Sequence, residues 1–69
     1  MDITQIIDAI EDANARSERA QIEWRGDISS LVTEIAVHSD YEHEDYAEID
    51  PGVWDVWGDG WRITATCNA

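Results

Sequence analysis

The chain has 69 residues, of which 16 are Asp or Glu and only 4 are Lys or Arg, so its formal net charge is −12. This length allows one domain, residues 1–69, because domains usually contain about 50 to 200 residues. A hydrophobic fraction of 43% is too high for a disordered segment, so we expect a folded chain with a thin core. The charge disfavours direct binding to nucleic acid or to an anionic membrane and favours a basic protein partner.

Cysteine content and hydropathy limit the cellular setting. Cys67 is the single cysteine, so we expect neither an internal disulfide nor a cysteine-based metal cluster. No apolar run approaches the roughly 20 residues of a membrane helix, and residues 1–5 have neither the basic region nor the apolar core of a signal peptide. The sequence therefore predicts a cytoplasmic protein in a reducing compartment.

The first predicted element is a helix over residues 3–17. Asp2 and Gln5 have the spacing of a capping box, in which each side chain bonds the other residue's backbone amide. Apolar residues recur at helical spacing from Ile3 to Ala13 and form one stripe that packs on the core. The acidic residues on the opposite, solvent-facing side are Asp8, Glu11 and Asp12.

A short strand and a second element follow. Residues 20–25 alternate apolar and polar side chains, which is typical of a half-buried strand. After Gly26, residues 28–37 fit an amphipathic helix capped by Asp27, although their β-branched content also suits a strand. We favour the helix.

The C-terminal third predicts a β-hairpin. Residues 53–57 and 61–66 are rich in Trp, Val, Ile and Thr, and Pro51-Gly52 precedes them as a turn. The three residues 58–60, Gly-Asp-Gly, suit a tight connection. We therefore predict an α+β fold, with an N-terminal amphipathic helix and a second helix packed on a small antiparallel β-sheet that ends in this hairpin.

An acidic stretch over residues 39–50 holds six carboxylates in twelve residues with no Lys or Arg. A calcium loop starting at Asp40 would need Gly at its sixth position and Glu at its twelfth, where this chain has Asp45 and Pro51. The two histidines lack the helical spacing and thiolate support of a zinc site. We expect a solvated acidic loop with no metal and no other cofactor.

The sequence disfavours an enzyme. It contains no nucleophile elbow, phosphate-binding glycine loop or H-E-x-x-H motif, and a thin core offers its acids no pocket that would raise a carboxyl pKa for acid–base catalysis. Most of the four Trp are expected to fill the core. A Trp left exposed on the hairpin, or Tyr41 or Tyr46, would suit an interface anchor.

Acidic side chains on strands, loops and a helix can approximate an array of phosphates. Side chains two residues apart on a strand lie about 7 Å apart, and phosphates of one DNA strand advance about 3.4 Å along the axis. A groove lined with Arg and Lys to hold DNA would attract such a surface. The candidate partner-binding residues are Asp8, Glu11, Asp12, Glu42, Glu44, Asp45, Glu48 and Asp50.

In size, charge and mixed helix-plus-hairpin layout, the whole chain resembles the small, acidic, phage-encoded anti-CRISPR proteins that mimic DNA. The resemblance implies a non-catalytic inhibitor in the cytoplasm of the host bacterium. It also implies that the partner is the subunit of a type I surveillance complex, such as type I-C, that recognises the duplex DNA motif beside the target. Three alternatives stay open: an immunity-like or antitoxin-like protein that neutralises a basic nuclease or toxin, an acidic domain adapted to high salt, and a metal-binding regulator.

Overall fold

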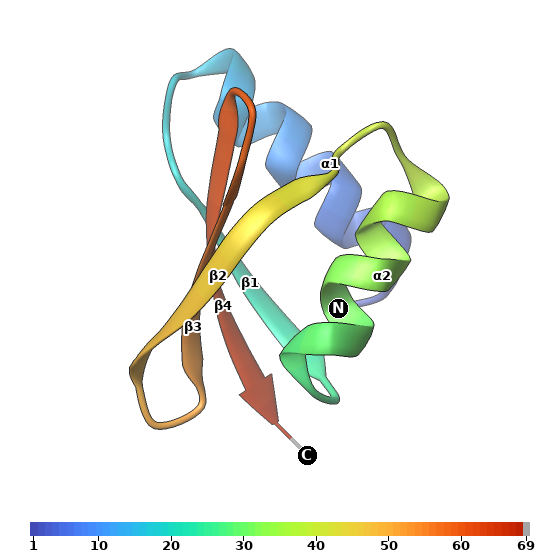
Figure 1. The fold of residues 1–69 in the computed structure, drawn as a ribbon. Helices are drawn as coiled ribbons and strands as arrows, with labels where there is room; N and C mark the ends of the chain where they lie inside the picture. The colour runs from blue at the N-terminus through green and yellow to red at the C-terminus, as the bar shows by residue number, and fades with distance from the viewer. Residues whose placement is uncertain (69) are drawn as a thin grey trace.

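The computed structural model describes residues 1–68 and contains two helices and one four-stranded sheet (Figure 1). In chain order the elements are α1 (Ile3–Ala15), β1 (Ala20–Arg25), α2 (Ile28–His38), β2 (His43–Asp50), β3 (Val53–Gly58) and β4 (Trp61–Asn68). Both helices lie on the same side of the sheet, and its other face is uncovered (Figure 1). The predicted small α+β fold is confirmed. No helix in residues 1–68 is long and apolar enough to cross a membrane.

Side-chain caps begin both helices. At α1 the capping box is complete, with Asp2 accepting from the Gln5 amide at 2.9 Å and Gln5 accepting from the Asp2 amide at 2.9 Å. At α2 the Asp27 carboxylate accepts from the Ser30 amide at 2.8 Å. Residues 28–38 are therefore a helix, and the strand alternative for this segment is wrong.

The sheet has the strand order β1-β4-β3-β2 and is mixed rather than wholly antiparallel. The pairs β2–β3 and β3–β4 are antiparallel, whereas β1 pairs with β4 in parallel. The parallel pair arises from the connection through α2, since a helical crossover makes β2 run in the same direction as β1. Two hairpins then reverse the chain twice, so that β4 runs the same way as β1.

Two details of the strands differ from the sequence expectations. Part of the acidic stretch is a strand rather than a loop, because residues 43–50 pair with β3. The C-terminal hairpin is tighter than expected, since Gly58 pairs with Trp61 and leaves a connection of Asp59 and Gly60 alone. Gly60 takes a φ of 81°, a left-handed conformation that glycine adopts without steric cost.

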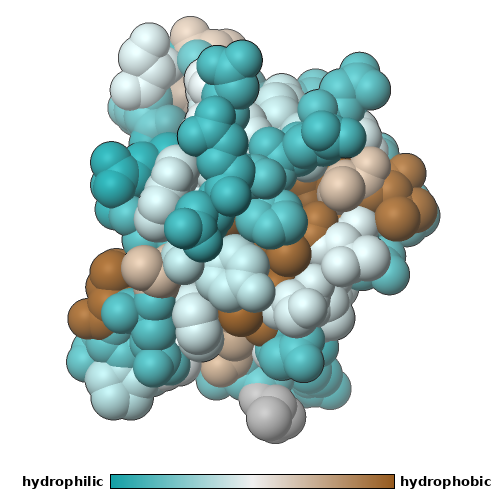
Figure 2. All heavy atoms as spheres, in the orientation of Figure 1, coloured by the Kyte–Doolittle hydropathy of each residue, from teal (hydrophilic) through white to brown (hydrophobic). Residues whose placement is uncertain are grey.

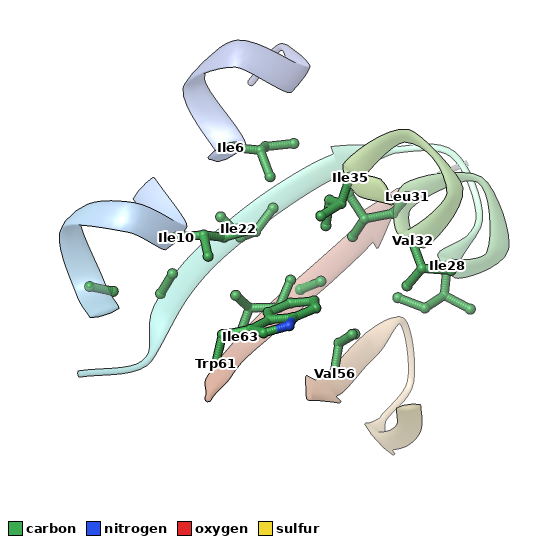
Figure 3. Close-up of a cluster of buried hydrophobic side chains, with 13 residues drawn as sticks. Ile6, Ile10, Ile22, Ile28, Leu31, Val32, Ile35, Val56, Trp61 and Ile63 are labelled. Atoms are coloured by element: carbon green, nitrogen blue, oxygen red, sulfur yellow. The ribbon is translucent and has the colours of Figure 1, made fainter. Parts of the chain in front are cut away.

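The core lies between the helices and one face of the sheet (Figure 3). Ile6 and Ile10 of α1 and Leu31 and Ile35 of α2 are almost completely buried, and they belong to the same core cluster as Ile63 of β4. Of the four Trp, only Trp61 is buried, at 6% exposure. The expectation that most of the Trp fill the core is met in part, because the other three are half-buried and two of them, Trp24 and Trp54, pack against the core.

Candidate acidic binding surface

Strand β2 forms one edge of the sheet and carries most of the acidic stretch. It pairs only with β3, and no helix packs closely on it. We use the name acidic edge for six exposed residues: Asp40, Glu42, Glu44, Asp45, Glu48 and Asp50. Figure 2, in which β2 lies toward the viewer, shows hydrophilic side chains over much of this side, interrupted by smaller apolar patches. With the rise of a β-strand, Glu44 and Asp50 lie about 20 Å apart.

No carboxylate of the acidic edge takes part in an ion pair within residues 1–68. The ion pairs there are Asp12–Arg16 at 3.0 Å, Asp55–Arg19 at 3.6 Å, Asp55–Arg62 at 2.7 Å and Glu34–His38 at 3.1 Å. Two edge carboxylates accept backbone amides instead, Asp45 from Tyr46 at 2.8 Å and Glu48 from Gly52 at 3.2 Å. The negative charge of this edge is therefore not neutralised by the chain itself.

The start of the acidic edge is fixed to the core by aromatic and backbone contacts. Tyr41 packs edge-on against Trp61 with ring centroids 5.8 Å apart, and the Trp61 indole donates to the Glu42 carbonyl at 3.3 Å. A surface hollow of about 450 Å³ lies here. It is lined by Asp40, Tyr41, Glu42, His43, Glu44, Asp59 and Trp61. Four carboxylates around two aromatic rings form a recess suited to a basic side chain.

The carboxylates of β2 project to both sides of the sheet. Residues opposite one another in an antiparallel pair share a face. Asp45 lies opposite Trp57 on the uncovered face, and Glu48 lies opposite Trp54 on the face that carries the helices. Tyr46, between these two acids, contacts the Trp54 ring edge-on at 5.6 Å. The acidic edge is thus a two-sided ribbon with half-buried aromatic rings beside its charges.

The three candidate acids of the first helix lie elsewhere. Asp8, Glu11 and Asp12 are exposed on α1, as predicted. However, α1 packs against β1, β4 and α2, whereas β2 is at the opposite edge of the sheet. The structure therefore separates the candidate residues into two groups.

The sequence reasoning missed a buried acid. Asp55 of β3 lies on the uncovered face of the sheet, yet it is only 7% exposed, because the side chains of Arg19 and Arg62 lie against it. The hydrogen bond from Arg62 holds the pKa of Asp55 below its ordinary value, although burial acts in the opposite direction, and the charge of Arg19 adds to the lowering. This cluster uses two of the four basic side chains and leaves fewer to balance the acidic edge.

The remaining reactive groups are the metal-ligating side chains and one thiol. Within residues 1–68, no three His, Cys, Asp or Glu side chains are grouped so that they could hold a metal ion. Cys67 is half-buried, and burial, with a smaller effect from Asp27, raises the pKa of its thiol. A thiol with a raised pKa is a poor nucleophile near neutral pH.

Comparison of the chain with protein-family models, with curated proteins and with solved structures finds no match.

Proposed function

We propose that the protein is a non-catalytic inhibitor whose acidic edge occupies the DNA-binding groove of a basic nucleic-acid-binding protein. The observation that carries the proposal is the uncompensated charge of this edge. Six carboxylates lie along one exposed border of the sheet, and none forms an ion pair within residues 1–68. Charges of one sign without internal partners attract a surface of the opposite sign and accelerate its association.

The geometry of the edge supports a phosphate-like surface. Carboxylates two residues apart on an extended strand lie about 7 Å from one another, which is about twice the 3.4 Å that each phosphate of a DNA strand advances along the axis, so acids on one face can match alternate phosphates. The hollow beside Glu42 gives a basic side chain a recess to enter, and Tyr46 and Trp54 supply aromatic area next to the charges. A groove that holds DNA with Arg and Lys presents the complementary chemistry.

The resemblance to DNA-mimicking anti-CRISPR proteins supports a specific partner. We propose the subunit of a type I surveillance complex, with type I-C as the first case, that recognises the duplex motif beside the target. In this account the protein competes with DNA for one site. The acids of α1 are secondary in this proposal, because α1 packs on β1, β4 and α2, whereas the acidic edge lies on β2 at the other border of the sheet.

A gel-shift experiment tests this function. Target duplex is added to a purified type I-C complex before or after the protein, at low and at high salt. We expect loss of the DNA-bound band when the protein is added first, less loss when DNA is added first, and weaker inhibition at high salt, since screening reduces charge attraction. An unchanged band under all four conditions would exclude this partner.

Two alternative functions, an immunity-like protein and an acidic domain adapted to high salt, predict different experimental results. An immunity-like protein would use the same edge to cover a basic nuclease or toxin, so affinity capture would recover that enzyme instead of a surveillance complex. For an acidic domain adapted to high salt, the acids would be only a solvated surface, and folding would require molar salt. Circular dichroism at low salt separates this case, because the proposed inhibitor is folded there.

A further inference from the structure

Arg25 is the one arginine of residues 1–68 that has no acidic partner within ion-pair distance, in a chain with 16 Asp and Glu. It is exposed at the end of β1. Glu23, two residues earlier on the same strand, is also exposed and also makes no ion pair in this part of the chain. Two unpaired charges of opposite sign therefore stand side by side on one strand.

The strand that carries them has an open edge. β1 is the last strand of the sheet and pairs only with β4. The Glu23 amide points away from β4, because it donates to the Met1 sulfur at 3.5 Å. Backbone groups alternate in direction along a strand, so the amides and carbonyls of Gln21 and Arg25 face outward as well. Met1 is half exposed, and its thioether sulfur is a weak hydrogen-bond acceptor. A pairing strand could therefore easily displace Met1 from the edge of β1.

The two edges of the sheet differ in the features that prevent strand pairing. Natural proteins protect edges with charged side chains and with bulges. The β2 edge has both, since it is strongly acidic and its pairing register shifts between His43 and Asp45 and again between Glu48 and Asp50. β1 has a continuous register from Ala20 to Arg25, and its two charges cancel.

We propose that β1 is a homotypic interface, at which a second copy of this chain pairs antiparallel with it and joins the two sheets into one. An antiparallel arrangement brings Glu23 of one copy beside Arg25 of the other, twice by symmetry, on the face that no helix covers. The acidic edges then lie at the two ends of an eight-stranded sheet, about 33 Å apart. That separation exceeds the Debye length of about 8 Å at physiological salt, so their mutual repulsion is screened.

Sedimentation equilibrium from micromolar to near-millimolar protein tests the proposal. We expect the wild type to approach twice the chain mass of 7.8 kDa as concentration rises. Glu23→Arg and Arg25→Glu each place like charges opposite one another and should weaken dimerisation about tenfold or more. The double variant Glu23→Arg/Arg25→Glu exchanges the two charges and should restore the wild-type dimerisation constant.

A matched control shows whether dimerisation depends on where a charge lies or only on the total charge of the chain. Asp59→Arg makes the same charge change as Glu23→Arg but lies in the turn between β3 and β4. By lowering self-repulsion it should leave dimerisation unchanged or strengthen it. Circular dichroism of every variant checks folding. A wild type that stays monomeric throughout, or a double variant as weak as the single ones, overturns the proposal.

Discussion

Asp55 shows how one residue organises the few positive charges of this protein. Its carboxylate accepts hydrogen bonds from Arg62 at 2.7 and 3.3 Å and lies 3.6 Å from Arg19, which precedes β1. The segment before β1 is therefore joined to the hairpin of β3 and β4 on the uncovered face of the sheet. Because Asp55 is buried and both arginines are partly exposed, this cluster stabilises the fold more than an isolated surface ion pair does.

Replacing this acid should lower stability in a pH-dependent way. We expect Asp55→Asn to reduce the free energy of unfolding by about 1 to 2 kcal/mol at neutral pH, after allowance for solvent around the arginines. Because the pKa of Asp55 is lowered in the folded state, its contribution is complete above the ordinary Asp pKa of about 4 and is lost as pH falls through the folded value. Urea unfolding from pH 7 to pH 3 measures this.

The difference between wild type and Asp55→Asn should thus be constant near neutral pH and shrink in acid. Asp12→Asn is the control, because it breaks the exposed Asp12–Arg16 pair and should cost about 0.5 kcal/mol or less. Equal costs for the two variants at neutral pH would contradict the assigned role of the buried cluster.

Gly58 is a second residue with a specific steric role. A Cβ atom at this position would collide with the Trp61 indole nitrogen and the Glu42 carbonyl oxygen. Gly58→Ala should therefore displace the contact that fixes the start of the acidic edge, at a cost of about 1 to 3 kcal/mol. Near-ultraviolet circular dichroism should show a changed aromatic signal from Tyr41 and Trp61.

Gly60→Ala provides the comparison for this prediction. The space around Gly60 is open, but its φ of 81° is unfavourable for alanine, so we expect a cost of about 1 kcal/mol with an unchanged aromatic spectrum. A Gly58→Ala protein with the wild-type spectrum would show that this close approach is not required.

At the scale of elements, the Asp27 cap begins α2, the helix that carries the chain from one edge of the sheet to the other. Removing the cap in Asp27→Ala should cost about 1 kcal/mol in thermal or urea unfolding. It should also lower the pKa of the Cys67 thiol slightly, because Asp27 contributes to raising that pKa. Asp40→Ala removes the same charge from an exposed residue and should change neither property. An equal loss of stability in the two variants would show that the lost charge, rather than the lost cap, lowers the stability.

The elements with local signals could be predicted from the sequence. Capping residues and helical spacing located α1 and α2, alternation located β1, and turn residues with β-branched and aromatic content located the C-terminal hairpin. β2 could not be found this way, because Asp and Glu are poor strand formers and the segment becomes a strand only by pairing with β3. The parallel contact between β1 and β4 is likewise set by tertiary structure.

The candidate site was predictable in part. Exposure of the acids on α1 and in residues 42–50 followed from composition and spacing. The cluster of Asp55 with Arg19 and Arg62 could not be predicted in this way, because it depends on the register of the hairpin. With a three-residue connection, Arg62 would lie opposite Val56, on the other face from Asp55. The observed connection of two residues pairs Arg62 with Trp57 and places it on the face of Asp55.

For the whole molecule, the central question is whether function depends on total charge or on where the charge lies. Two separate groups of acids, one on the acidic edge and one on α1, allow a direct comparison. The edge variant is Glu42→Lys/Glu44→Lys/Asp45→Lys, and the helix variant is Asp8→Lys/Glu11→Lys/Asp12→Lys. Each replaces three acids and raises the net charge from −12 by the same amount. Both should remain folded, since self-repulsion decreases.

The most direct test is the affinity of wild type, edge variant and helix variant for a purified type I-C surveillance complex, measured over a range of salt concentrations. Our account predicts that the edge variant loses at least about tenfold in affinity, with a shallower salt dependence, while the helix variant binds nearly as the wild type does. Equal losses in both variants, or full binding by the edge variant, would contradict the assignment of the acidic edge as the binding surface.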